Sequence, residues 1–115
     1  MKKLLPLLLL AAPALADPPE IVATEAAPQG DDWRVSVTLL HPDTGWQHYA
    51  DGWRIEAEDG TVLGTRVLAH PHESEQPFTR ALSVVSIPEG TTRIFIRARC
   101  LKDGWNEGRT AYDLP

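Results

Sequence analysis

The sequence predicts an all-β protein, a seven-stranded antiparallel sandwich of the immunoglobulin or fibronectin type III kind. Apolar and polar residues alternate with period two along most of residues 20–114, as in strands that bury one face. Turn-forming residues separate these runs, and no run shows the 3.6-residue spacing of an amphipathic helix. Several short strands divided by such turns are typical of a two-sheet sandwich.

The alternating runs define the strands in chain order. We expect strands over residues 20–27, 33–39, 53–57, 61–68, 78–87, 94–100 and 109–114. Asp59-Gly60 lies between the third and fourth runs and predicts a tight hairpin, because both turn positions favour positive φ. Pro88-Glu89-Gly90 ends the fifth run as a turn. The Cys-Trp-Cys signature of antibody-type domains is missing, which favours the fibronectin-like label, and a small β-barrel is the main alternative.

The first sixteen residues have the features of a secretory signal peptide. Two lysines follow the initiator, an apolar run reaches Ala12, and Ala14-Leu15-Ala16 is a small-residue cleavage site. We therefore expect a signal peptide over residues 1–16, a β-sandwich domain over residues 17–115, and a periplasmic or secreted protein. The residue directly after the cut is Asp17 rather than a cysteine, and no other run is long enough to span a membrane, so neither a lipid anchor nor membrane insertion after cleavage is expected.

The expected mature chain is a single acidic domain. Without Lys2 and Lys3 it carries 9 basic against 16 acidic side chains, a formal charge of −7. This balance, with no basic cluster, argues against binding to nucleic acid or to an anionic membrane surface. Catalysis has little support, because no Gly-x-Ser-x-Gly elbow occurs and no carboxylate pair stands out from an acidic surface. We therefore predict a protein that is not an enzyme.

Cys100 is the single cysteine, so the chain has no internal disulfide and its fold must rest on packing. It follows Ile94, Ile96 and Ala98 on one face of a predicted strand, and we expect it to be buried in the core. A metal-ligand role and pairing with another molecule are the alternatives. A blue-copper site is not favoured, because the mature chain lacks methionine and no histidine follows Cys100.

Three long loops are predicted to meet at one end of the sandwich. Connections alternate between the two ends of such a fold, so residues 41–49, 69–77 and 101–108 share one end and the short turns share the other. All four histidines and two of the four tryptophans lie in these loops. Long loops on a rigid scaffold commonly bind ligands, so we expect function at this end.

Histidines in these loops form a candidate zinc or copper site. The residues on either side of Pro71 are histidines, and in an extended segment residues i and i+2 point to the same side. The neighbouring loop can add a third imidazole, and the adjoining glutamates an oxygen ligand. The candidate ligands are His48, His70 and His72, with His41, Glu73 and Glu75 as further donors. The alternative is that these histidines are polar surface residues and that the protein carries no cofactor.

Aromatic residues in the same loops are candidates for binding a protein or glycan partner. Trp46 and Trp105 each follow a glycine, and loop indoles can stack on sugars or anchor a peptide. The alternative is that they fold back and seal the end of the sandwich. Trp33 and Trp53 begin strands and are expected in the core. Our main hypothesis is an exported, non-catalytic binding module that uses Trp46, Tyr49, Asp51, Glu75, Arg80 and Trp105; a metal-binding protein is the alternative.

Arg80 occupies an awkward position in the strand predicted over residues 78–87. Alternation places Phe78, Leu82 and Val84 on the inward face, and Arg80 shares that face. Either a β-bulge shifts the register, or Arg80 is buried against a carboxylate such as Asp51.

Four motifs carry a resemblance that extends over nearly all of the chain after residue 16. They are Gly45-Trp46-x-His48-Tyr49-Ala50-Asp51-x-Trp53, Asp59-Gly60-Thr61-Val62-Leu63-Gly64, His70-Pro71-His72-x-x-Glu75-Gln76-Pro77-Phe78-Thr79-Arg80 and Ile87-Pro88-Glu89-Gly90. Together they resemble a family of small exported bacterial proteins with an immunoglobulin-like sandwich. The resemblance implies this fold and export, and it implies no particular activity. Its site residues would be His48, Tyr49, Asp51, His70, His72, Glu75 and Arg80.

Overall fold

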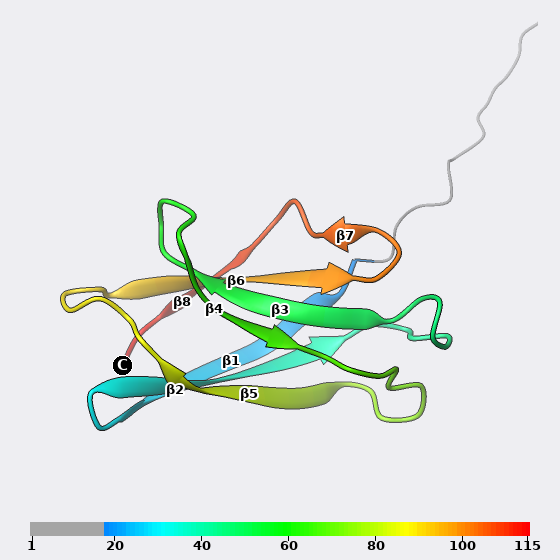
Figure 1. Cartoon of the computed structure of the whole chain (residues 1–115), viewed down its shortest axis with the longest axis horizontal. Helices are drawn as coiled ribbons and strands as arrows, with labels where there is room; N and C mark the ends of the chain where they lie inside the picture. Colours follow the sequence, from blue (N-terminus) through cyan, green and yellow to red (C-terminus); the bar gives the residue numbers. More distant parts are fainter. Residues whose placement is uncertain (1–17) are drawn as a thin grey trace, which may run out of the picture.

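The computed structural model describes residues 18–115, which form two antiparallel β-sheets packed against each other (Figure 1). The described residues include no helix, and therefore none that could cross a membrane. This confirms the prediction of an all-β chain. The predicted signal peptide, residues 1–16, lies outside the described residues.

Eight strands build the two sheets, in place of the seven expected. One sheet has the order β1-β2-β5, and the other has the order β4-β3-β6, with β7 and β8 both pairing with β6. The strands are β1 (Glu20–Gln29), β2 (Asp32–Leu40), β3 (Ala50–Glu56), β4 (Val62–Val67), β5 (Phe78–Val85), β6 (Arg93–Cys100), β7 (Gly104–Trp105) and β8 (Thr110–Asp113).

The additional strand is β7, two residues that the sequence pattern assigns to a loop. Gly104 has a φ of +82°, and at this turn the chain folds back along β6. Gly104 then pairs with Cys100, and Trp105 with Arg99. Further along, β8 pairs with the first half of β6 and corresponds to the strand predicted over residues 109–114.

The inward-facing residues of both sheets form one hydrophobic core. Its buried members are Val35, Val37, Leu39, Ala50, Trp53, Ile55, Leu68, Phe78, Val85, Ile94, Ile96, Ala98 and Cys100. Each large apolar side chain contributes about 1.5–3 kcal/mol by leaving water. Trp53 and Cys100 are buried as predicted, whereas Trp33 is half-buried and packs against the edge of the core.

The predicted hairpin at Asp59-Gly60 is present, but only Gly60 adopts a positive φ, at +91°. The Gly60 N–H donates to the Ala57 carbonyl, and the Ala57 N–H donates to the Thr61 carbonyl. A connection of this length is built on a type I turn followed by one left-handed residue, so Asp59 keeps an ordinary conformation.

Strand β5 contains a bulge near its end. The bulge lies after Arg80, the residue whose position suggested one. Between Trp33 and Val35 of β2, the pairing on β5 moves from Val85 to Leu82, so β5 holds one extra residue. Val84 takes that place with a φ of +59° and is 74% exposed. Val85 turns inward instead, and the prediction that Val84 faces the core is therefore wrong.

The three long loops meet at one end of the sandwich, as predicted (Figure 1). The His41 N–H donates to the side-chain oxygen of Gln76 at 2.9 Å, which joins the β2–β3 loop to the β4–β5 loop. The Leu101 N–H donates to the Tyr49 carbonyl at 2.9 Å, which joins the segment after β6 to the same group. The short turns β1–β2, β3–β4 and β5–β6 lie at the other end.

Candidate metal centre

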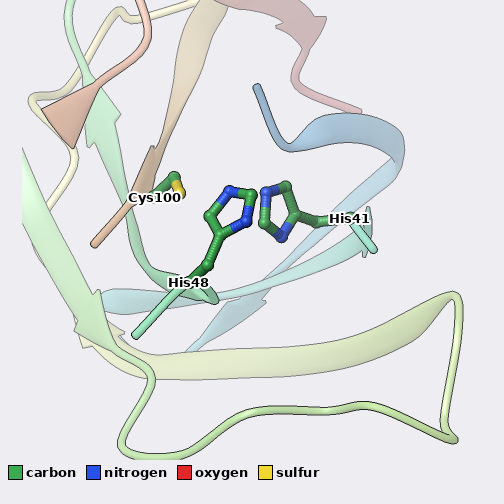
Figure 2. Close-up of side chains that lie close together, drawn as sticks. All are labelled: His41, His48 and Cys100. Atoms are coloured by element: carbon green, nitrogen blue, oxygen red, sulfur yellow. The ribbon is translucent and has the colours of Figure 1, made fainter. Parts of the chain in front are cut away.

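Two histidines and the lone cysteine come together where the β2–β3 loop meets the end of β6 (Figure 2). His41 directly follows β2, His48 lies just before β3, and Cys100 is the last residue of β6. One ring nitrogen of each histidine and the Cys100 Sγ lie within 4.8 Å of one another. The two rings meet edge to face with centroids 5.0 Å apart. We call these three residues the His41–His48–Cys100 cluster.

A tight turn within the β2–β3 loop carries His48 back toward His41. The His48 N–H donates to the Gly45 carbonyl at 3.1 Å, and the Thr44 N–H donates to the His48 carbonyl at 3.0 Å. Gly45 has a φ of +135°, which side-chain-bearing residues rarely adopt. The glycine therefore permits the turn that places this imidazole inside the loop.

Asp43 is buried beside the cluster and orients His41. Its Oδ1 accepts hydrogen bonds from the His41 Nδ1 at 2.5 Å and the Ala50 N–H at 2.9 Å, and its Oδ2 accepts one from the His72 N–H at 2.8 Å. Because a carboxylate accepts, the His41 Nδ1 is the donor in this hydrogen bond, and in a neutral ring the Nε2 then keeps a lone pair. Histidines that bind metal ions commonly have a carboxylate partner of this kind.

Both imidazoles of the cluster keep an unsatisfied nitrogen inside the protein. The Nε2 atoms of His41 and His48 are buried and have no hydrogen-bond partner among the described residues. His41 and Cys100 are both 0% exposed. A buried polar atom without a partner costs about 1–3 kcal/mol, so two of them side by side call for an explanation. A metal ion fits, because imidazole nitrogen and thiolate sulfur are ligands that zinc and copper prefer.

The cluster includes His48 but not His70 or His72, the other two predicted ligands. Their rings lie side by side, with centroids 4.6 Å apart. However, His72 stacks flat on Phe78 at 3.9 Å, and its Nε2 lies 2.9 Å from the Arg80 guanidinium. A nitrogen engaged in this way is not free to bind a metal ion. His48, His70 and His72 therefore do not form one cluster among residues 18–115.

The environment of His72 favours a neutral ring. Burial lowers the pKa of His72 below its ordinary value, and the positive charge of Arg80 acts in the same direction. Its Nδ1 lies 4.0 Å from the Asp43 Oδ2, which is too far for a hydrogen bond. His72 thus packs the base of the β4–β5 loop, and its backbone N–H holds Asp43 in place.

Arg80, in β5, pairs with a carboxylate of the adjoining β4–β5 loop rather than with Asp51. Its guanidinium pairs with the Glu75 Oε1 at 3.2 Å, whereas Asp51 pairs with Arg99 at 3.0 Å. The predicted Arg80–Asp51 pair is therefore wrong. Ala50 faces the core, and strand alternation turns the next residue to the outer side of the sheet, away from Arg80.

Trp46 does not seal the end of the sandwich, because it is 66% exposed. Its indole meets the Tyr49 ring edge to face, with centroids 5.9 Å apart. The same short turn that directs His48 inward thus presents an indole to solvent.

Trp105 lies on the outer side of the five-stranded sheet, whereas Cys100 faces the core. The Arg54 guanidinium covers its ring at 4.1 Å, and that of Arg99 lies at 5.7 Å. Trp105 also lines an open hollow of about 900 Å³ between the start of β1 and the β7–β8 segment. This predicted binding residue is therefore separate from the cluster.

The pairing of His41 with Cys100 is absent from the sequence-based predictions, although two patterns point to it. Period two from Val37 through Leu39 directs residue 41 inward as well. The antiparallel pairing of β3 with β6 sets Cys100 opposite Ala50, close in sequence to His48. The His-x-His motif is the more conspicuous signal, and its rings serve packing and polar contacts instead.

No model of a known protein family matches the chain, and no solved structure matches it. A protein of Halomicrobium mukohataei described as a "putative lipoprotein" is 44% identical over 70 residues. This match covers 61% of the present chain and 34% of that protein. The chain thus spans about a third of the length of the curated relative that it matches.

Proposed function

We propose that the protein is an exported, cell-envelope-associated binding protein that holds one transition-metal ion between His41, His48 and Cys100. The observation that carries this proposal is the pair of buried, unpartnered Nε2 atoms beside a buried thiol. Asp43 supports it further, since it accepts a hydrogen bond from the His41 Nδ1 and leaves the Nε2 as the atom available to a metal ion.

Export is supported by two features. The first sixteen residues have the basic start, apolar run and small-residue cleavage site of a signal peptide. The relative from Halomicrobium mukohataei carries a name that refers to a lipoprotein, a class of protein attached to the cell envelope. Periplasmic or secreted location follows for this chain if its leader is removed.

The fold is proposed to be of the fibronectin type III kind. An immunoglobulin constant-type domain joins its fourth strand to the sheet that contains the first two. Here β4 pairs with β3 in the opposite sheet, which supports the fibronectin-like arrangement. The two sheets then contribute ligands from both sides, His41 after β2 and Cys100 from β6.

In this proposal the protein binds the metal ion and does not use it for catalysis. Two of the three ligands are wholly buried, so a substrate has no direct path to an ion held between them. Catalytic zinc sites instead keep an open coordination position for water or substrate.

A thermal titration tests the proposal. A metal ion that binds only the folded chain at about 100 times its Kd adds about 2.7 kcal/mol, which raises Tm by about 10 °C or more in a domain of this size. We expect Zn²⁺ or a copper ion to do this for the natural chain. His48→Ala and Cys100→Ala should abolish the rise, and His70→Ala is the matched control because its imidazole lies outside the cluster.

Two results would overturn the metal proposal. One is a Tm that no added metal ion changes in the natural chain. The other is an equal rise in the His48→Ala and Cys100→Ala chains, which would place the ion elsewhere. Equilibrium dialysis with metal analysis gives the stoichiometry independently of folding stability.

The exposed indole of Trp46 favours a second candidate function, the binding of a protein or glycan partner at the same end. An exposed tryptophan on a rigid turn is a common anchor in interfaces. Trp46→Ala should weaken capture of such a partner while leaving Tm unchanged. A fall in Tm of several degrees would show that the ring is needed for folding instead.

A further inference from the structure

The donor atoms of the His41–His48–Cys100 cluster narrow the class of metal ion. One thiolate and two imidazoles make a soft, nitrogen- and sulfur-rich group, which disfavours Mg²⁺, Ca²⁺ and Mn²⁺. The metal ions that we consider further for this exported protein are zinc, copper(II) and copper(I). They differ in how many ligands they need and in how readily they bind thiolate.

The cluster offers three donors and no fourth. Among the described residues, no further histidine, cysteine, aspartate or glutamate joins this group. Asp43 is the nearest carboxylate along the loop, and its oxygens already accept three hydrogen bonds. Structural zinc sites are almost always four-coordinate, whereas copper(I) is stable with three ligands.

Burial argues against water as a fourth ligand. His41 and Cys100 are 0% exposed, and Cys100 is surrounded by core residues of β3 and β6 such as Ala50 and Ala98. A three-ligand zinc site would have to admit and hold water beside these two wholly buried ligands. A trigonal copper(I) ion needs none.

Copper(II) of the blue-copper kind commonly takes a weak axial thioether beside two histidines and a cysteine. The only methionine in the sequence is Met1, which lies outside the described residues. The cluster therefore lacks the ligand that most often accompanies a copper(II)–thiolate site.

We propose that this site takes copper(I) as a three-coordinate ion bound by the His41 Nε2, the His48 Nε2 and the Cys100 sulfur. The inference rests on the proposed metal-binding function and names its metal. Binding forms a copper–sulfur bond, the thiol gives up its proton to solvent, and no electron is transferred. One proton is therefore released for each copper(I) bound.

The geometry requires a modest closure. Donors at 2.0–2.3 Å from a shared trigonal ion lie about 3.5–4 Å apart, so the widest present spacing of 4.8 Å must shrink by about 1 Å. His48 lies in a loop turn rather than in a strand, so it is the ligand best placed to move. The other two stay on the ends of β2 and β6.

An anaerobic competition assay tests the copper(I) inference. The purified protein is titrated into a coloured copper(I)–bicinchoninate complex, and the loss of colour measures copper withdrawn. We expect one copper(I) per chain and one proton released per copper in weakly buffered solution. Cys100→Ser should weaken binding by about 100-fold or more, which is about 2.7 kcal/mol, and His70→Ala should leave it unchanged.

A parallel zinc titration separates the two proposals. If zinc raises Tm as strongly as copper(I) does, and Cys100→Ser removes both effects, the metal site stands but the copper(I) assignment is wrong. If copper(I) stays on bicinchoninate and zinc changes nothing, both proposals fail. Copper absorption spectra that report fewer than three ligands, or no sulfur, would also contradict the assignment.

Discussion

Asp43 joins the candidate ligand His41 to two other segments of the loop end. Its carboxylate accepts hydrogen bonds from a ring nitrogen and from two backbone N–H groups, one in β3 and one in the β4–β5 loop. The side chain is fully buried, so each of these bonds replaces contact with water that folding removes. At the residue scale, this one carboxylate couples the shape of the loops to the orientation of the imidazole.

Replacing Asp43 with asparagine tests that coupling. Asparagine has about the same size, but its single carbonyl oxygen cannot replace both carboxylate oxygens as an acceptor. We expect Asp43→Asn to weaken metal binding by about 10–100-fold and to lower the free energy of unfolding by about 1–3 kcal/mol. Chelator competition and urea unfolding measure the two effects.

The matched control is Asp103→Asn, an exposed carboxylate at the same end of the molecule. It should change neither quantity. Equal metal affinity in the Asp43→Asn and natural chains would show that Asp43 has only a structural role.

The burial and contacts of single side chains were the hardest features to predict from the sequence. Alternation correctly predicts that Cys100 is buried, because strand side chains alternate between two faces. It does not reveal that His72 would stack on Phe78, since that contact depends on how the β4–β5 loop folds. Loop conformation is set by tertiary hydrogen bonds, such as those to Asp43, that leave no periodic trace in the sequence.

At the scale of elements, the outer face of the five-stranded sheet is held by an ionic cluster. Glu56 in β3 accepts bonds from Arg54 at 2.7 Å, from Arg97 at 2.7 Å and from Arg109 at 3.0 Å. These guanidinium groups come from β3, β6 and the segment before β8. Arg109 also covers the Phe95 ring at 3.9 Å. The carboxylate thus ties the last strand to the centre of the sheet.

Glu56 should make the fold sensitive to acid. Hydrogen bonds, led by that from Arg97, lower the pKa of Glu56 from 4.5 to about 2 against the opposing effect of burial. Because the folded-state pKa is depressed, the stabilisation is complete above pH 4.5 and is lost as pH falls toward 2. At neutral pH it amounts to about 3 kcal/mol.

Urea unfolding between pH 7 and pH 2.5 measures this effect. Glu56→Gln should be less stable than the natural chain at pH 7, and its stability should fall less between pH 4.5 and 2.5. Glu89→Gln, in an exposed turn, should follow the natural chain throughout. Parallel pH curves for the Glu56→Gln and natural chains would disprove the assigned role of Glu56.

The β5 bulge stores strain in one residue. Val84 has a φ of +59°, a region that costs a β-branched residue roughly 1–2 kcal/mol. Val84→Gly removes that cost and should raise the free energy of unfolding by up to about 1 kcal/mol. Val62→Gly, at an exposed position of β4 with an ordinary conformation, should instead lower it by about 0.5–1 kcal/mol. A loss of stability in both variants would contradict the strained conformation.

The seven predicted strands correspond to β1–β6 and β8, and most of them follow directly from period two and from turn residues. The two-residue β7 and the bulge do not, because a short pairing or a single inserted residue barely alters the hydrophobic pattern.

At the scale of the whole molecule, the cluster lies between the two sheets of a domain that has no disulfide. His41 continues β2 of the three-stranded sheet, and Cys100 ends β6 of the five-stranded sheet. An ion bound to both therefore links the sheets across the core. Such a link stabilises the fold by the free energy of metal binding and makes stability depend on metal concentration.

The gathering of long loops at one end was predictable because it follows from the alternation of connections in a sandwich. Which histidines would meet there was not, since that depends on the turn around Gly45 and on the hydrogen bonds of Asp43. The architecture therefore locates the candidate site, and the loop geometry selects its residues.

The most direct test of the account is a crystal structure of the protein prepared with copper(I) without oxygen, with anomalous diffraction recorded at the copper absorption edge. We expect one strong anomalous peak about 2.0–2.3 Å from the His41 Nε2, the His48 Nε2 and the Cys100 sulfur. A peak beside His70 and His72, or no peak in crystals that contain copper, would contradict it.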